Sequence, residues 1–402
     1  MSEQINTPKM RFPEFRDEWE MKIIKELFNV VSGSTPLRSN TSYYENGNIP
    51  WVKTTDLNNS LINNTSEKVT NIALDNLKLL PKDTVLIAMY GGFNQIGRTG
   101  ILNIKATTNQ AISALIKKDD YNSKFLQSYL NFNVKQWRRF AASSRKDPNI
   151  TKKDIEKFKI PYTCREEQEK IGTFFSKLDR QIELEEEKLE LLEQQKRGYM
   201  QKIFSQELRF KDENRADYPN WKKIAIKEVA NLTAGKGKKN ENKGKYIIMD
   251  MGTVTKNGTM LTHKSTPYES DLLNKGDLVM PKDDIGGGHI IGKTVFIPES
   301  HKYVLGDHVY RLEIKNCNSL FLHYYINSDI VNHSLKRKVT GSAQLGLNRK
   351  SVEEEVIKIP CLEEQEKIEN LFNKIDNLIE LQIDKIGLLK RRKQGLLQKM
   401  FV

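Results

Sequence analysis

The segment with the clearest chemical potential is Gly287–Thr294, because its sequence GGHIIGKT fits the phosphate-binding pattern GxxxxGK[ST]. In nucleotide-binding proteins this loop follows a strand and opens a helix, so that backbone N–H groups and the lysine meet the phosphates. Here the next residues, Val295–Pro298 (VFIP), are typical of a strand. The pattern therefore lacks the context that a nucleotide site needs.

An equivalent segment earlier in the chain serves as a control. Gly92–Thr99 reads GFNQIGRT and is also followed by apolar residues typical of a strand, Ile101–Ile104 (ILNI). The two segments share glycines and one basic residue, Arg98 or Lys293. We interpret both as copies of a glycine-rich hairpin rather than as a nucleotide-binding loop.

Catalytic patterns are not found elsewhere in the sequence. All six histidines lie in the second half, and Ala111 and Gln127 stand where that half has His308 and His323. A catalytic histidine common to both halves is thus excluded. The sequence also has no Pro-Pro pair for an [ND]PP[YF] methyltransferase motif, and Asn48–Trp51 (NIPW) is better read as a turn entering a strand. We predict no catalytic residue, no metal site and no cofactor-binding site in this chain.

Basic and amide side chains in glycine-rich or polar loops instead favour contacts with DNA. Guanidinium and amide groups can read base edges in the major groove, and lysines neutralise phosphates. At each position a solvated loop residue is the alternative. The predicted DNA-binding residues are Lys53, Tyr90, Phe93, Asn94, Gln95, Arg98, Ser143, Ser144, Arg145 and Lys146 in the first half, and Lys236, Lys238, Lys239, Lys282, Asp283, His289, Lys293, Lys336, Arg337, Lys338 and Gln344 in the second.

The positive charge is concentrated outside two long segments of helical pattern. The chain of 402 residues has a formal net charge of +13. Residues 165–202 carry −2 and residues 363–402 carry +1, so +14 lies elsewhere. A basic globular part suits a polyanion such as DNA, although a generally basic protein is the plainer alternative.

The elements that must position these residues occur twice, about 197 residues apart. Glu166–Ile171 (EEQEKI) returns as Glu363–Ile368, and each copy opens a long helical segment. The segments end in the related sequences GYMQKIF (198–204) and GLLQKMF (395–401), and Trp19 is matched by Trp221. Two copies at this spacing indicate duplicated domains rather than a solenoid.

Each copy predicts a mixed α/β (α+β) module followed by one long helix. Strands are expected at 84–89, 100–104 and 111–117, and at 277–280, 293–297 and 308–314, with helices at about 123–140 and 319–336. We call residues 1–160 the first head and residues 211–359 the second head. The predicted boundaries are 1–160 (first recognition domain), 161–210 (central helix), 211–359 (second recognition domain) and 360–402 (C-terminal helix).

Apolar residues of both long helices recur in alternating steps of four and three, which is the pattern of a coiled coil. A parallel pair would bury Lys196 against Lys393, a contact between like charges. We therefore predict an antiparallel pair within the chain, overlapping over roughly 40 Å, close to one turn of B-DNA. In the predicted register, paired numbers sum to 578: Leu178 with Met400, Ile182 with Leu396, Glu185 with Lys393, Leu189 with Leu389, Leu192 with Ile386, Lys196 with Gln382, Tyr199 with Ile379, and Ile203 with Ile375.

The cysteine content and the hydropathy of the sequence indicate the cellular compartment of the protein. Three cysteines, Cys164, Cys317 and Cys361, are too few and too irregularly spaced for a disulfide framework or a zinc site, so we expect reduced thiols. No apolar run approaches the roughly 20 residues that span a bilayer, and the first residues have no signal-peptide core. We expect a soluble, cytoplasmic protein.

Taken together, this arrangement resembles the specificity subunit of type I restriction-modification systems. The resemblance covers essentially the whole chain. It rests on the proline-to-EQ entrances at Pro161 and Pro360, the helix ends at Gly198 and Gly395, and the paired tryptophans at the start of each head.

The resemblance implies two target-recognition domains that each read half of an asymmetric, interrupted double-stranded DNA sequence. It implies a non-catalytic chain that directs adenine methylation and ATP-dependent restriction by its partners. Those partners would be two modification subunits, which bind S-adenosylmethionine, and two restriction subunits, which use ATP and Mg²⁺. Differences between the heads then predict two different half-sites. A coiled-coil adaptor that bridges two proteins without catalysis is the alternative function.

Overall fold

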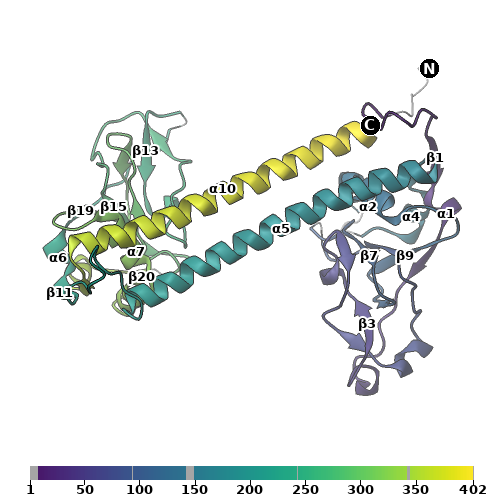
Figure 1. Cartoon of the computed structure of the whole chain (residues 1–402), viewed down its shortest axis with the longest axis horizontal. Coiled ribbons are helices and arrows are strands. Elements are labelled where there is room, and N and C mark those ends of the chain that lie inside the picture. Colours follow the sequence, from purple (N-terminus) through teal and green to yellow (C-terminus); the bar gives the residue numbers. More distant parts are fainter. Residues whose placement is uncertain (1–7, 93, 142–148, 242, 342–344, 402) are drawn as a thin grey trace. The chain divides into compact units, whose positions relative to one another are not determined.

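The computed structural model describes residues 8–92, 94–141, 149–241, 243–341 and 345–401. The chain divides into two compact units, one of Met1–Glu187 with Ile383–Val402 and one of Lys188–Gln382. Each unit holds one head together with parts of the two 40-residue helices, α5 (Arg165–Phe204, teal in Figure 1) and α10 (Leu362–Phe401, yellow). The two long helices predicted from the repeat are confirmed.

The first head consists of short strands with the short helix α1 near its start, followed by α2, α3 and α4 and a last strand. In chain order its elements are β1 (Glu20–Ile23), α1 (Ile24–Leu27), β2 (Phe28–Ser32), β3 (Ile49–Val52), β4 (Ser60–Ile62), β5 (Lys68–Val69), β6 (Val85–Ala88), β7 (Thr99–Leu102), β8 (Thr107–Thr108), β9 (Ile112–Lys117), α2 (Ser123–Phe132), α3 (Val134–Ala141), α4 (Lys152–Lys157) and β10 (Lys159–Tyr162).

The strands of the first head form a five-stranded sheet in the order β2-β9-β6-β7-β4, a three-stranded sheet β5-β3-β8, and the pair β1-β10. Every residue of β6 is buried, because apolar clusters cover both faces of the larger sheet. A strand buried on both faces appears in a sequence as an unbroken apolar run, which is why this strand could be predicted.

The second head repeats this plan with strands of its own. Its elements are β11 (Lys222–Ala225), α6 (Ile226–Val229), β12 (Ala230–Ala234), β13 (Tyr246–Met249), β14 (Ser265–Thr266), β15 (Leu278–Pro281), β16 (Asp283–Asp284), β17 (Val295–Phe296), β18 (Tyr303–Leu305), β19 (Val309–Ile314), α7 (Ser319–Asn327), α8 (Asp329–Arg337), β20 (Leu345–Gly346), α9 (Arg349–Glu353) and β21 (Val356–Ile359).

Sheet order confirms that the second head is a copy of the first. The order β12-β19-β15-β17 matches β2-β9-β6-β7, and β14-β13-β18 matches β5-β3-β8. In both heads the central strand of the smaller sheet pairs antiparallel on one side and parallel on the other. The predicted mixed α/β (α+β) module is therefore present twice.

The helix predicted after the last sheet strand is wrong in one respect, because it is broken in both heads. Residues 123–140 form α2 and α3, separated at Asn133, whose side chain donates to the Tyr129 carbonyl at 2.9 Å. Residues 319–336 form α7 and α8, separated at Ser328, whose backbone is extended with φ −65° and ψ 156°. Short polar side chains bond to the backbone and so compete with the continuing helix.

The repeated EEQ entrance is explained by one buried carboxylate in each copy. Glu167 is fully buried and accepts from Arg11 Nε at 2.6 Å and from Trp19 Nε1 at 2.9 Å. Burial would raise the pKa of Glu167, but hydrogen bonds from Arg11, Thr163 and Trp19 outweigh it and hold this pKa below the usual value. In this way the start of α5 is tied to the segment that precedes β1.

The second unit repeats this carboxylate cluster. Glu364 accepts from Arg209 Nη2 at 2.7 Å and from Trp221 Nε1 at 3.2 Å. Arg11 and Arg209 were not recognised in the sequence, although each is followed by phenylalanine and precedes the head's tryptophan.

The glutamine that follows each buried glutamate holds the helix after the sheet. Gln168 Oε1 accepts from the backbone N–H of Asn122, whose side chain caps α2 by accepting from Phe125 N at 2.9 Å. Gln365 and Asn318 make the same contacts at the start of α7. The E-Q pair thus fixes the long helix to its own head through two different elements.

Contacts inside each unit confirm that the long helices run antiparallel. In the first unit Phe401, at the end of α10, stacks on Phe175 of α5 with ring centroids 5.9 Å apart. In the second unit Phe204, at the end of α5, stacks on Phe372 of α10 at 5.7 Å. Each helix end therefore contributes an aromatic side chain to the core of a head.

The two lysines within the helix pair bond to carboxylates that the sequence did not predict. Lys393 bonds to Asp179 and Lys385 lies 2.6 Å from Glu185, both within the first unit. In the second unit Lys196 donates to Asp376 at 2.5 Å. The pairing of Glu185 with Lys393 and of Lys196 with Gln382 stays a prediction. A lysine side chain is long enough to leave the seam and reach a carboxylate further along the partner helix, and an ion pair is favoured over an amide.

Two further predictions from the sequence concern membrane-spanning helices and the cysteines. Among the described residues, no helix is both long and apolar enough to cross a membrane. Cys164, Cys317 and Cys361 are free thiols, as predicted. Burial raises the pKa of Cys317 to about 12, so this thiol is unreactive.

Candidate nucleic-acid interface

The two glycine-rich segments are hairpins, as predicted. The first joins the antiparallel strands β6 and β7, and the second joins β15 and β17. Since a strand and not a helix follows Gly287–Thr294, the geometry of a phosphate-binding nucleotide loop is not formed.

One glycine in each hairpin brings the turn against a helix. Gly97 has φ +77°, and a Cβ there would lie 3.0 Å from the Trp137 side chain of α3. Gly292 has φ +69°, and a Cβ there would lie 3.3 Å from Leu335 of α8. Positive φ and close approach both favour glycine, so the hairpins are fixed beside the helices that follow the sheet.

The same hydrogen-bonding positions connect hairpin and helix in both heads. In the first head Thr99 Oγ1 donates to Asn131 Oδ1 of α2 at 2.7 Å. In the second head Thr294 N donates to Asn327 Oδ1 of α7 at 2.7 Å, and Asn327 Nδ2 returns a bond to the Thr294 carbonyl at 2.9 Å. The asparagines occupy equivalent positions near the ends of their helices.

A third chain segment completes this junction. In the first head Asn59, with φ +59°, accepts from Thr99 N through its side chain at 2.9 Å. In the second head Gly258, with φ +73°, lies at the same place, where a Cβ would be 2.4 Å from Asn327 Nδ2. Glycine has no side chain to accept a hydrogen bond. The bond that Asn59 accepts from Thr99 N in the first head is therefore replaced by the bond that Asn327 accepts from Thr294 N in the second.

The basic residues of the two hairpins form hydrogen bonds with different partners. Arg98 is half-buried, and its Nε donates to the Asn94 carbonyl of the same hairpin at 2.9 Å. Lys293 Nζ donates to the Asn327 carbonyl, at the end of α7, at 2.9 Å. Burial and the charge of the neighbouring Lys336 lower the pKa of Lys293, and the charge of Asp329 opposes this shift only in part. This lysine serves as a helix cap within its own head.

Lys293 lies next to a half-buried histidine, His323, that has no counterpart in the first head. His323 Nδ1 lies 3.1 Å from Thr294 Oγ1. Burial first, and then the charges of Lys196 and Lys293, lower the pKa of His323 to about 3, so that it is neutral at physiological pH. His323 therefore packs as a neutral polar group at the junction.

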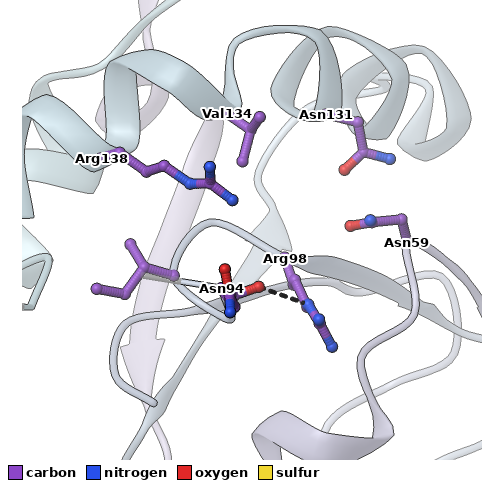
Figure 2. Close-up of a pocket in the computed structure, with 7 residues that line it drawn as sticks. Asn59, Asn94, Arg98, Asn131, Val134 and Arg138 are labelled. Atoms are coloured by element: carbon purple, nitrogen blue, oxygen red, sulfur yellow. Dashed lines mark hydrogen bonds between the residues drawn. The ribbon is translucent and has the colours of Figure 1, made fainter. Parts of the chain in front are cut away.

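Around the Arg98 hairpin the structure forms an open pocket of about 230 Å³. Figure 2 shows Arg138, Val134 and Asn131 entering from the helical side, and Asn59, Asn94 and Arg98 from the loops. Two of these residues, Asn94 and Arg98, belong to the predicted DNA-binding set. Asn59, Asn131 and Arg138 were not predicted, because the first two are separated from the hairpin in sequence and Arg138 resembled one of many exposed helical charges.

The other predicted residues of the first head are dispersed. Tyr90 is 42% exposed beside the hairpin, and Gln95 is half-buried within it. Lys53 lies elsewhere, directly after β3 of the smaller sheet, and its Nζ donates to Glu67 at 3.0 Å. Phe93, Ser143, Ser144, Arg145 and Lys146 lie outside the described residues.

In the second head, four predicted basic residues are paired with carboxylates. Lys238 bonds to Asp271, Lys239 lies 2.9 Å from Glu241, Lys282 lies 2.8 Å from Asp283, and Lys338 lies 2.5 Å from Glu355. Lys236, His289 and Arg337 are exposed, Lys336 is half-buried near Lys293, and Gln344 lies outside the described residues.

Asp283 anchors a small charged cluster beside the second hairpin. It accepts from Lys282 Nζ and lies 2.7 Å from His308 Nδ1. Burial would raise the pKa of Asp283, but the bonds from Lys282 and His308 lower it overall. The carboxylate therefore stays ionised and holds the side chains of Lys282 and His308 in place. Among the described residues no group of histidine, cysteine and acidic side chains is arranged to hold a metal ion.

Comparison with known proteins identifies the family. The family model described as the type I restriction modification DNA specificity domain matches residues 16–194 and again residues 218–391. The chain belongs to this family. The two matches begin just before Trp19 and Trp221, so the duplication seen in the fold is a duplication of the family's domain.

Individual relatives agree with this assignment. Over 401 residues the chain is 25% identical to the type I restriction enzyme MjaVIII specificity subunit of Methanocaldococcus jannaschii, covering 93% of this chain and 89% of the relative. It is 31% identical over 184 residues to the MjaIX specificity subunit of the same organism, covering 44% and 41%. The crystal structure of the type I restriction-modification system S subunit from M. genitalium has the same fold, with a TM-score of 0.64, 17% identity, and coverage of 98% and 99%.

Proposed function

We propose that this chain is the non-catalytic subunit that selects the DNA target of a type I restriction-modification complex. Each head would read one half of an asymmetric, interrupted sequence. The observation that carries the proposal is that two heads with matching orders of their shared strands present different chemistry at the same hairpin. Arg98 lines an open pocket in one head, and Lys293 caps α7 in the other. Unlike surfaces on the same scaffold are what recognition of two unlike half-sites requires.

The charge distribution supports DNA as the ligand. The +14 charge outside the long helices would attract the phosphate backbone and speed the search along it. The predicted contacts then divide by chemistry: exposed cations such as Lys236 and Arg337 suit phosphates, and the amides of the hairpins suit base edges.

The catalytic steps would belong to partner subunits. We propose two modification subunits, which bind S-adenosylmethionine and methylate adenine, and two restriction subunits, which use ATP and Mg²⁺. Exposed leucines support a pair of identical partners: Leu184 and Leu191 of α5 are 48% and 63% exposed, and their equivalents in α10, Leu381 and Leu388, are 66% and 61% exposed. Apolar side chains repeated at equivalent positions of both copies offer the same contact twice.

A head exchange tests the proposal. Residues 1–160 are replaced by the first head of another specificity subunit, the chimaera is assembled with its modification subunits, and methylated adenines are mapped by single-molecule sequencing. The expected result is a new sequence in one half of the target, with the other half unchanged. The reciprocal exchange of residues 211–359 is the matched control and should change only the other half.

Two outcomes would reject the proposal. If the chimaera methylates the full original target, the heads do not read sequence. If the assembled complex binds duplexes of any sequence equally while still joining its protein partners, the chain is an adaptor between proteins. Methylation by the purified chain alone would contradict its non-catalytic role.

A further inference from the structure

The junction beside Arg98 differs from its counterpart in the second head in the partner of its basic residue. In the second head Lys293 donates to the Asn327 carbonyl at the end of α7, and the half-buried His323 lies 3.1 Å from Thr294 Oγ1. In the first head Arg98 turns toward its own hairpin, and the space between hairpin and helices stays open at about 230 Å³. In the first head this space is a candidate ligand site.

The open pocket is cationic. Its lining contains two guanidinium groups, Arg98 and Arg138, and no carboxylate. Among the residues that the structure describes, no carboxylate forms an ion pair with either arginine. Arg98 uses only Nε for its bond to Asn94, so its two terminal amino groups face no protein acceptor within the described residues.

Amide groups surround the two arginines. Asn131 and Asn59 use their Oδ1 atoms to accept from Thr99, which directs their amide Nδ2 groups elsewhere as donors. A recess lined by guanidinium and amide side chains matches a group with several anionic oxygens. Backbone N–H groups are not needed for this recognition.

We infer that this pocket holds one phosphate of the DNA backbone at the half-site of the first head. Side chains that read base edges must project from a protein surface into the groove, whereas a recessed pocket receives a group that itself projects from the ligand. On duplex DNA the projecting anionic groups are phosphates, and two arginines bind them through charge-assisted, bidentate hydrogen bonds. The contact positions the first head and carries no sequence information of its own. This inference rests on the proposed function.

The test uses the assembled methyltransferase complex and a duplex that contains its mapped target, with affinity measured over a range of salt concentrations. Arg98→Gln and Arg138→Gln are each compared with the matched control Arg139→Gln, which removes the same charge from the next position of α3 outside the pocket. Each pocket variant should weaken binding on the order of tenfold. The double variant should reduce the slope of log K against log salt by about 0.9, the share of one phosphate, and none of these variants should change the methylated sequence.

A second measurement locates the contact. Duplexes carrying a single neutral methylphosphonate are scanned across the half-site of the first head. One position should weaken binding by the wild-type complex, and the same substitution should cause a smaller loss in Arg138→Gln and no further loss in the double variant.

The outcomes separate this inference from the proposed function. A changed methylation sequence in Arg98→Gln or Arg138→Gln would overturn the phosphate contact in favour of base reading, and so would pocket variants indistinguishable from Arg139→Gln. If the wild-type complex shows no preference for any duplex sequence, the proposed function itself fails.

Discussion

Arg98 and Lys293 occupy equivalent positions in the two hairpins but bond to different partners. Arg98 Nε donates to the Asn94 carbonyl within its hairpin, and Lys293 Nζ donates to the Asn327 carbonyl at the end of α7. One residue leaves its charge accessible, whereas the other uses it to stabilise the head. Duplication has therefore preserved the sign of the charge but not its role.

Lys293→Met is expected to destabilise the second head by about 1 kcal/mol, since it removes a hydrogen bond and a cation from the end of α7. Hydrogen–deuterium exchange of α7 measures the loss. Arg98→Met is the control in the other head and should leave the protection of α2 unchanged. Equal effects of both substitutions would mean that Lys293 has no capping role.

Acidification should loosen the second head through His323. The pKa of this half-buried histidine is lowered to about 3, far below the value of roughly 6.5 in an unfolded chain. Above pH 6.5 both states are neutral and the group has no effect. As pH falls below 6.5 the unfolded state gains a proton that the folded state excludes, so stability falls by about 1.4 kcal/mol per pH unit, or about 2 kcal/mol at pH 5.

His323→Gln checks this pH effect, because the first head already has glutamine at that place, Gln127. Exchange protection of α7 is compared at pH 7.5 and pH 5 after correction for the intrinsic rate. The variant should lose less protection than the wild type on acidification. The same loss in both proteins would assign the pH dependence to other groups.

Glu167→Gln should destabilise the first unit by about 3 kcal/mol, because it removes the charge that balances the nearly buried Arg11. Glu166→Gln, an exposed neighbour in the same turn, should change stability by less than about 0.5 kcal/mol. Urea denaturation monitored by tryptophan fluorescence follows the effect, since Trp19 donates to the same carboxylate. Equal midpoints for the two variants would rule out the structural role of Glu167.

The ion pair between Asp179 and Lys393 can be tested by exchanging its charges. Asp179→Lys and Lys393→Asp should each destabilise the helix pair of the first unit, and the double variant should recover part of the loss. For a partly exposed pair we expect a coupling free energy of about 0.5–1 kcal/mol, smaller at high salt. Additive effects of the two substitutions would indicate that the pair contributes nothing.

The fold could be predicted where the sequence repeats or forms unbroken apolar runs. The repeated EEQ sequences and the apolar runs around β6 and β15 were sufficient to predict two mixed α/β heads and two long helices. The breaks at Asn133 and Ser328 could not be predicted, because they depend on side chains that bond to the local backbone. The lysine partners of the helix pair were also missed, since heptad positions do not specify how far a lysine extends along its neighbour.

The candidate site was predictable only in part. The hairpins were recognisable from their glycines, and Arg98 and Asn94 followed from them. Asn59, Asn131 and Arg138 converge on the same pocket from three other segments, which only the folded chain brings together. The capping role of Lys293 also depends on the position of α7, which sequence spacing does not give.

The position of Phe401 has a consequence for biosynthesis. Its ring stacks on Phe132 and Phe175 and lies against Trp19, Phe125 and Tyr129, all in the first unit. Nearby, Met10 N donates to the Lys399 carbonyl at 2.9 Å. The ribosome translates the first head early, but the core of this head lacks the Phe401 side chain until the end of α10 has been synthesised and has left the exit tunnel. The second head has all its core side chains by residue 382, so the later-made head can mature first.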